Sequence, residues 1–469
     1  MTPDASPPED LSSRFRFVDL FAGIGGFAAV LRGYGGTPVY SVEIDKRAAR
    51  VYELNWGHSP LGDITQDAND DVMAVPAHDI LAAGFPCQPF SKSGAQRGMD
   101  ETRGTLFWNI LKIIEVHHPS VVLLENVRNL AGPRHFHEWQ VVVESLRAQG
   151  YRVSETPAVF SPHLLPLEAG GRPHVRERVF ITATYDPDDL MGGADPMPAV
   201  ENRSLRGGEE WDLEADLPLD PDHEVEGLGL SADERQWIAA WDEWVRIMRA
   251  IHEDESRRLG EKPRRLPGFP IWIDAWVHED ELRIPEGTPS WKANFLRKNS
   301  ALYTAHRAAF DEWIERHAAR DFPPSRRKFE WQAQDAATLW ECVMQMRPSG
   351  LRAKRATHLP ALVAITQTSI IGTRERRLSP REAARLQGLP DNFEFGDQPA
   401  AATYRQLGNG VNVGAVWHVL REHVKRDEAI LKTSEAGRRI FQAIATDSPV
   451  SPDDVMESVV AEGKARTSN

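Results

Sequence analysis

The sequence predicts an α/β protein built on a doubly wound, mostly parallel sheet, followed by a second, smaller domain of mixed α+β structure. Two observations predict the first domain: short apolar runs alternate with helical periodicity from residue 14 to 185, and glycine or polar residues follow each run. A third observation predicts the second domain. The alternation stops at an acidic, Pro- and Gly-rich stretch, after which the chain becomes helical and aromatic.

In the first domain, five apolar runs predict buried strands, at residues 15–21, 39–42, 80–85, 121–124 and 179–182. Helical periodicity between them predicts helices at 27–32, 46–55, 106–116 and 139–149. Ligands of doubly wound sheets bind beyond the carboxyl ends of the strands. The residues that follow each strand are therefore the first candidates for a functional site.

In the second half, Trp237, Trp241 and Trp244 share one face of a helix, a pattern more typical of core packing than of base stacking. Apolar runs there predict strands at 269–276 and 359–371. Periodicity predicts helices at 301–319, 333–346 and 381–387, and a glycine turn entering another helix at 408–424.

The same changes in composition predict the domain boundaries. We expect a disordered N-terminus at 1–13, the first domain at 14–185, the second at 186–398 with an acidic, loop-like insert at 186–230, a segment completing the first domain at 399–424, and a helical tail with a frayed end at 425–469.

The net charge of −14 comes from one part of the chain. Between Asp186 and Glu234 there are 16 acidic residues against two arginines, so the remainder is neutral and nucleic-acid binding is not excluded. Basic runs such as 326–328 and 352–355 offer phosphate contacts. Two cysteines, no secretory signal and no long apolar stretch predict a cytoplasmic protein without a disulfide framework or a membrane partner.

A glycine-rich turn joins the first predicted strand to the first helix. Its sequence runs from Asp19 to Gly26 and includes Phe21, Gly23 and Gly25. Glycines let a ligand approach the backbone, and Glu43 ends the next strand where a carboxylate can hold ribose hydroxyls. The turn also fits the dinucleotide fingerprint, so a dehydrogenase remains an alternative at this point.

Side chains that can act as a nucleophile, an acid or a cation follow the later strands. Cys87 comes after the third strand, at the edge where ligands bind and where a stabilised thiolate acts as a nucleophile. By contrast, Cys342 falls in a predicted helix and is expected to be an inert buried residue. Glu125 follows the fourth strand as a candidate general acid, and Arg176 and Arg178 add cations to the same rim.

Together these residues resemble the ordered motifs of the bacterial cytosine-C5 DNA methyltransferases. The resemblance covers about residues 15–185 and 375–420, roughly half the chain. Its parts are the turn 17–26, Glu43-Ile44-Asp45, Gly62-Asp63-Ile64, Pro86-Cys87-Gln88, 103–107, Glu125-Asn126-Val127, Arg176-Glu177-Arg178, 377–388 and 406–411. The sequence departs from the family at Pro173-His174, where the family usually has Pro-Gln.

The resemblance implies a Rossmann-like S-adenosylmethionine-dependent methyltransferase domain and a target-recognition domain. The catalytic residues it implies are Cys87, which adds to C6 of a flipped-out cytosine, Glu125, which protonates N3, Arg178, which neutralises O2, and Arg176, which supports the pocket. The base that removes the C5 proton is left open.

The resemblance also implies two sets of contacts. The cofactor S-adenosylmethionine would lie on Phe21, Gly23, Gly25, Gly26, Glu43, Ile44, Asp63, Ile64, Pro86, Leu106 and Asn409. Double-stranded DNA would contact Gln88, Ser93, Arg97 and Arg103 in a catalytic loop, and Arg352, Lys354 and Arg355 in the recognition domain. No metal ligand set is expected.

Three alternatives to a DNA methyltransferase stand beside this interpretation: the dehydrogenase, a methyltransferase of transfer RNA, and a DNA-binding relative without activity. We expect a monomer on DNA, with a cognate restriction endonuclease or defence protein as a further partner.

Overall fold

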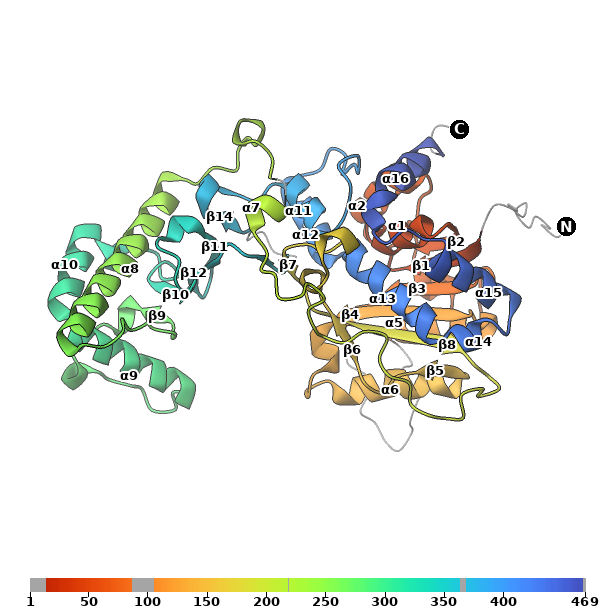
Figure 1. Ribbon diagram of the computed structural model, residues 1–469, viewed down its shortest axis with the longest axis horizontal. Helices are drawn as coiled ribbons and strands as arrows, with labels where there is room; N and C mark the ends of the chain where they lie inside the picture. The colour runs from red at the N-terminus through yellow and green to blue at the C-terminus, as the bar shows by residue number, and fades with distance from the viewer. Residues whose placement is uncertain (1–13, 87–104, 218, 363–367, 467–469) are drawn as a thin grey trace. The chain divides into compact units, whose positions relative to one another are not determined.

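The computed structural model describes residues 14–86, 105–217, 219–362 and 368–466. They form two compact units (Figure 1). The first unit comprises Met1–Glu210, Ala361–Ile365 and Ala383–Asn469, and the second comprises Trp211–Pro360 and Thr366–Glu382. None of the helices in the described ranges is long and apolar enough to cross a membrane.

The first unit is built on a seven-stranded sheet in the order β2-β1-β3-β4-β8-β5, with β6 also paired to β8. The strands β2, β1, β3 and β4 are parallel, and β8 runs antiparallel to β4, β5 and β6. Their bounds are β1 Phe15–Leu20, β2 Gly36–Val42, β3 Ile80–Gly84, β4 Val121–Val127, β5 Tyr151–Val153, β6 Ala158–Phe160 and β8 Arg178–Tyr185. All five predicted strands are confirmed.

Helices cover both faces of this sheet (Figure 1), which confirms the doubly wound fold. Alternate strand residues such as Val18 and Ile181 join α5 and α6 in one apolar cluster. On the opposite face, Thr184 bonds to His423 of α13, which packs beside α1. The helices are α1 Gly26–Gly33, α2 Lys46–Trp56, α3 Ile64–Asp67, α5 Leu106–His117, α6 Phe136–Ala148, α12 Ala400–Asn409, α13 Val413–Arg426, α14 Glu428–Leu431, α15 Glu435–Phe441 and α16 Met456–Ala465.

The strand order reverses between β1 and β3. From β1 the chain continues to β2 on one side, whereas β4 lies beyond β3 on the other. The loops that leave the carboxyl ends of β1 and β3 therefore diverge, and such a switch point is where open α/β sheets bind ligands.

The C-terminal segment belongs to the first unit, and the prediction that its end is frayed is wrong as far as Arg466. Helix α16 buries Met456 and Val460 against α1 and α2. Its Lys464 ammonium also donates to the Asn392 carbonyl, at 2.5 Å. The polar composition of this segment gave no indication that it packs on the first unit, because only a few apolar residues of α16 make the contact.

The second unit contains a six-stranded sheet in the order β15-β14-β11-β12-β10-β9. Its tryptophans form the core as predicted, since Trp241 and Trp244 are fully buried among Trp276, Trp313 and Phe329. The elements are α7 Leu213–Asp216, α8 Ala232–Leu259, β9 Ile271–Trp272, α9 Ser290–Ala305, α10 Arg307–His317, β10 Lys328–Gln332, β11 Cys342–Arg347, β12 Gly350–Arg355, β13 Leu359–Pro360, β14 Ile370–Ile371 and β15 Arg376–Arg377; α11, Pro380–Leu386, leads back to the first unit.

Four predictions for this half need correction. The helix expected at 333–346 is wrong, because β11 begins at Cys342 and buries alternate residues. The strand expected at 269–276 is limited to β9, and the one at 359–371 is reduced to two short strands flanking residues outside the described ranges. The acidic insert is not a plain loop: Leu213 and Leu217 are buried, and Asp222 pairs with Arg376 at 2.8 Å.

Candidate active site

The turn after β1 holds an unusual backbone conformation. Phe21 has a positive φ of 57°, a backbone conformation that residues other than glycine rarely adopt. Gly23 and Gly25 follow with φ of 56° and 91°. The Glu43 carboxylate fixes the turn by accepting the Gly23 N–H at 2.8 Å and the Asp45 N–H at 2.7 Å. Gly23 and Glu43, which lie 20 residues apart in the sequence, are thus in direct contact.

The two glycines of this turn differ in the space around them, and this difference makes a test. A Cβ at Gly25 would lie 2.0 Å from Nε1 of Trp56, whose indole donates to the Ile24 carbonyl, whereas nothing lies within 4 Å of a Cβ at Gly23. We expect Gly25→Ala to lower the free energy of unfolding by about 2–5 kcal/mol, from backbone strain plus overpacking.

Gly23→Ala is the matched control. It should cost about 1–2 kcal/mol from the left-handed backbone alone. Urea denaturation of both variants measures the difference. Equal losses in the two variants would mean that the Trp56 contact does not constrain the turn.

The other predicted cofactor residues differ in how they are presented. Ile44, beside Glu43, is 70% exposed and offers an open apolar surface. Asp63 caps α3 by accepting from Thr65, and the Ile64 side chain is buried in the core, so this pair has a structural role as well. Of the remaining four, Gly26 is buried at the start of α1, Pro86 and Asn409 are exposed, and Leu106 is half-buried.

Glu125 lies near the end of the buried stretch of β4, which runs to Asn126, beside the next strand of the sheet. It is 7% exposed, and Arg178 of β8 donates from Nε to its Oε1 at 3.0 Å. Burial raises the pKa of the Glu125 carboxyl, although Arg176 and Arg178 act in the opposite direction. A carboxyl that keeps its proton to higher pH is suited to act as a general acid.

The end of β3 lies against this carboxyl. A Cβ at Gly84 would be 3.7 Å from Glu125 Oε2, and Asn126 donates its side-chain amide to the Phe85 carbonyl at 2.9 Å. The chain is therefore held beside Glu125 one residue before Pro86. The predicted nucleophile Cys87 and the loop residues Gln88, Ser93, Arg97 and Arg103 follow, and all five lie outside the described residues.

Arg176 is a clamp inside the first unit. It is 2% exposed, and its guanidinium donates to the carbonyls of Gly408, Gly410 and Leu362. Burial lowers the pKa of Arg176 to about 9, with Arg178 contributing, which still leaves it charged at neutral pH. It thus joins segments more than 180 residues apart in sequence, which no local pattern could have indicated.

His174 explains how the departure from the family pattern is accommodated. The ring is fully buried and accepts the Leu362 N–H at Nε2, 3.2 Å away. Burial, reinforced by Arg176, lowers the pKa of His174 well below its usual value, so the ring stays neutral. A neutral imidazole can accept this bond without repelling the adjacent guanidinium.

The three predicted DNA contacts of the second unit do not share one face of β12. Arg352 and Lys354 point away from the core, whereas alternation places Arg355 with Leu351 and Ala353 on the core side at the end of the strand. Arg352 is held by Glu330 of β10, at 2.7 Å from Nε and 2.6 Å from Nη2. Gln345 of β11 lies directly across from Arg352 and was not singled out by the sequence.

The second cysteine is inert, as predicted, although it lies in a strand rather than a helix. Cys342 is 1% exposed and donates from Sγ to the Thr338 carbonyl. Burial raises the pKa of its thiol to about 12, so no thiolate forms at neutral pH.

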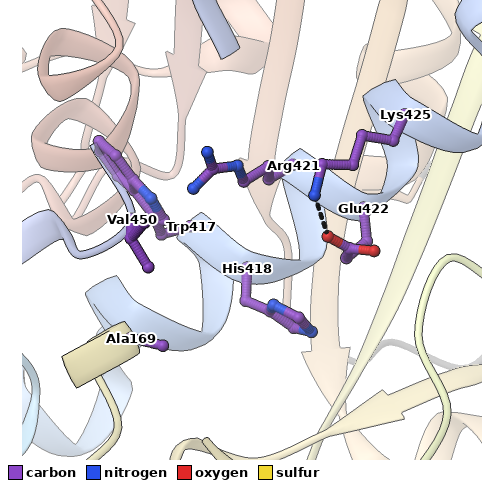
Figure 2. Close-up of a pocket in the computed structure, with 7 residues that line it drawn as sticks. All are labelled: Ala169, Trp417, His418, Arg421, Glu422, Lys425 and Val450. Carbon is purple, nitrogen blue, oxygen red and sulfur yellow. Dashed lines mark hydrogen bonds and ion pairs between the residues drawn. The ribbon is translucent and has the colours of Figure 1, made fainter. Parts of the chain in front are cut away.

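A pocket of about 270 Å³ elsewhere in the first unit contains none of the predicted site residues (Figure 2). It lies along α13, where the ion pair of Lys425 and Glu422 spans 2.9 Å at its edge. Its lining is Ala169, Trp417, His418, Arg421, Glu422, Lys425 and Val450. The chemistry assembled by β1, β3, β4 and β8 is separate from this pocket.

Comparison with known proteins gives consistent matches. A family model described as C-5 cytosine-specific DNA methylase matches residues 15–425. The chain is 48% identical to the type II methyltransferase M.AluI of Cellulosimicrobium cellulans over 93% of this chain and 97% of that protein. It is 40% identical to M.HhaI of Haemophilus parahaemolyticus over 45% of this chain and 59% of that one. A solved structure, a putative DNA modification methyltransferase encoded within an E. coli prophage, matches with a TM-score of 0.47 and 17% identity over 89% of this chain and 99% of that one.

Proposed function

The chain belongs to the C-5 cytosine-specific DNA methylase family, and on that premise we propose that it methylates cytosine within a specific duplex sequence through a covalent adduct of Cys87. It is an S-adenosylmethionine-dependent DNA (cytosine-5-)-methyltransferase. The observation that carries the proposed mechanism is the buried Glu125, with a raised pKa and Arg178 at 3.0 Å, beside the end of β3.

In this mechanism the cytosine leaves the base stack and its ring meets three side chains. The Cys87 thiolate forms a bond to C6 while N3 takes the proton of Glu125, and C5 becomes nucleophilic. Arg178 stabilises charge at O2. After C5 accepts a methyl group, loss of its proton to a base and expulsion of the Cys87 thiolate restore the aromatic ring, and N3 returns its proton to the Glu125 carboxylate.

The turn after β1 fits the cofactor. Phe21 and Ile44 offer apolar surfaces for an adenine, and the Glu43 carboxylate, already fixed by two backbone N–H groups, retains lone pairs for ribose hydroxyls. When bound, S-adenosylmethionine supplies an electrophilic methyl group on a sulfonium. Pro86, Leu106 and Asn409 would border the same place.

Bisulfite sequencing tests this function directly. Plasmid DNA from cells expressing the chain should carry 5-methylcytosine at one position of one recurring short sequence. Unmodified DNA, despite folded protein that binds S-adenosylmethionine, would support a relative without activity. Methylation confined to transfer RNA would assign a different substrate.

The biological setting is part of the proposal. The extended similarity to a type II methyltransferase supports a modification enzyme that protects DNA from a cognate restriction endonuclease in a bacterial cytoplasm. We propose that it acts as a monomer on DNA.

We also propose that the outward face of β11 and β12 reads the DNA sequence. Arg352 and Gln345 face each other across the two strands, with Lys354 two residues along. Arginine and glutamine are the side chains that make bidentate contacts to guanine and adenine edges. Glu330 holds the Arg352 guanidinium in one orientation, which suits directional recognition.

Alanine substitutions of Arg352, Lys354, Arg355 and Gln345 test this reader. We expect weaker DNA binding for the outward residues Arg352 and Lys354, and for a base-reading residue a relaxed recognition sequence at one position, a loss of about 1–3 kcal/mol. Arg355, on the core side of β12, should have the smaller effect on binding. Bisulfite sequencing of one plasmid with each variant is the measurement. Gln236→Ala, on an exposed turn of α8, is the control and should change nothing. An unchanged target and unchanged affinity in all four variants would place the reader elsewhere.

A further inference from the structure

A cluster of cations lies on the second unit, outside the sheet face described above. Helix α9 carries Lys292, Arg297 and Lys298 and has no acidic residue along its 16 positions. The segment before β9 adds three more bases: Lys262, Arg264 and Arg265. All six are exposed. Within the described ranges, none of the six forms an ion pair.

Aromatic contacts join these two segments. The Lys298 ammonium lies 5.6 Å from the centre of the Phe269 ring, and Phe295 packs edge-on against Trp272 of β9 at 5.7 Å. Asn299 of α9 fastens the segment by donating to the Pro270 carbonyl and accepting the Trp272 N–H. These contacts order residues 269–272 against α9, whereas the stretch before them lies along α8, where the carbonyls of Lys262 and Arg264 contact Ser256 and His252.

An exposed tryptophan adds to the cations of α9. Trp291, in the first turn of α9, leaves 59% of its side chain exposed while one edge packs on Phe295 at 6.1 Å. The nearby acidic run Glu279–Glu281 meets the other end of the helix, where the Glu279 N–H donates to Thr304. Among the described residues, no carboxylate forms an ion pair with Lys292 or Arg297 in the first half of α9.

We propose that the cationic surface of α9, defined as Trp291, Lys292, Arg297 and Lys298, binds backbone phosphates of the duplex that flanks the recognition sequence. The proposal rests on the proposed function for its ligand, duplex DNA. It adds a contact that gives affinity without sequence information, since phosphates are the same at every base pair.

The sheet order supports this occupant. Strand β9 forms the edge of the sheet next to β10, and α9 packs beside β9 (Figure 1). The surface is therefore displaced from the β11 and β12 reader toward one edge of the same unit. Duplex that lies across the reader and continues past this edge would meet unpaired cations and an aromatic ring suited to sugar contacts. A protein carrying 14 excess negative charges needs such a local concentration to approach DNA.

The test compares a triple variant with a matched control. The variant K292A/R297A/K298A removes three unpaired cations. The control R258A/R307A/R316A removes three cations of the same unit that are each paired within their own helix, with Asp254, Asp311 and Glu312 respectively; Arg316 also pairs with Glu243 of α8. Both change the net charge equally, and all six substitutions place alanine in exposed helical positions, where it favours the helix.

Fluorescence anisotropy would measure Kd on duplexes with one recognition sequence and increasing flanks, across a series of salt concentrations. We expect wild type and control to bind more tightly as the flank on one side lengthens, and the triple variant to lack that gain. Its plot of log affinity against log salt should be shallower by about 0.9 for each phosphate that the variant no longer neutralises. The sequence methylated should be the same for all three proteins.

Two outcomes would overturn the proposal. One is equal slopes and equal flank dependence for the triple variant and the control. The other is a change of oligomeric state on size-exclusion chromatography without loss of DNA affinity, which would make the surface an interface between copies. Failure of the proposed function is separate, because it would appear as unmethylated plasmid with the wild-type protein.

Discussion

Cys87→Ser is expected to abolish methylation while leaving S-adenosylmethionine binding nearly intact. The substitution removes only the nucleophile, because a serine hydroxyl near neutral pH lacks the ionised fraction that makes a thiolate reactive. Two residues before it in the sequence, the Phe85 carbonyl is held by Asn126, the neighbour of the proposed acid Glu125. Methyl transfer to plasmid DNA and calorimetric titration of the cofactor measure the two effects.

Cys342→Ser is the control for this variant. Its thiol is buried, donates to the Thr338 carbonyl and has a pKa raised to about 12, so methylation should persist. Wild-type protein should also form a denaturant-resistant complex with DNA containing 5-fluorocytosine, because fluorine cannot leave as the C5 proton does. Absence of that complex on a sequence the enzyme methylates would contradict the covalent mechanism.

Glu125→Gln is expected to slow methyl transfer by several orders of magnitude with a modest loss of DNA affinity. Loss of one positioned acid costs about 10²–10⁴-fold. The amide keeps the shape of the side chain but cannot deliver a proton to N3. Single-turnover kinetics measure this step, and a decrease of less than about tenfold would assign the proton to another group.

The pH dependence gives a second measurement for the same residue. Since burial raises the pKa of Glu125, the wild-type carboxyl stays protonated to higher pH than an exposed one, and the rate attributable to it should fall as pH rises through that pKa. The Gln variant has no proton to lose there and should lack this decrease.

Glu177→Gln is the matched control, because Glu177 lies between the two arginines in sequence but pairs outward with Arg128. An exposed ion pair of this kind contributes about 0–1 kcal/mol. Thermal denaturation of both variants separates a catalytic loss from unfolding caused by leaving Arg178 without its partner.

The sequence by itself determined the sheet of the first unit and the edge at which the site lies. Buried parallel strands are short continuous apolar runs, and the residues that follow them can be read directly: the turn at Phe21, Gly84 before Cys87, and Glu125. The resemblance of the motifs to a known family identified that family, because such motifs can be recognised in their order whatever the segments between them contain.

Periodicity was a weaker guide in the second unit. The end of the predicted helix 333–346 forms strand β11 from Cys342 onward. Its apolar residues also fit a helical window, and pairing with β12 and β14 decided for a strand. Short apolar runs do not separate the two structures until their neighbours are known. The acidic insert was misjudged for a related reason: Asp222 is stabilised by Arg376, 154 residues later in the chain.

Only the tertiary structure decided which charged groups are buried and what they contact. Arg176 and Arg178 are two residues apart in one motif, yet one clamps the carbonyls of Gly408 and Gly410 while the other pairs with Glu125. Likewise, α16 completes the first unit through contacts with helices near the N-terminus. These roles depend on segments hundreds of residues apart meeting in a desolvated interior, where an arginine needs several acceptors and a carboxyl retains its proton.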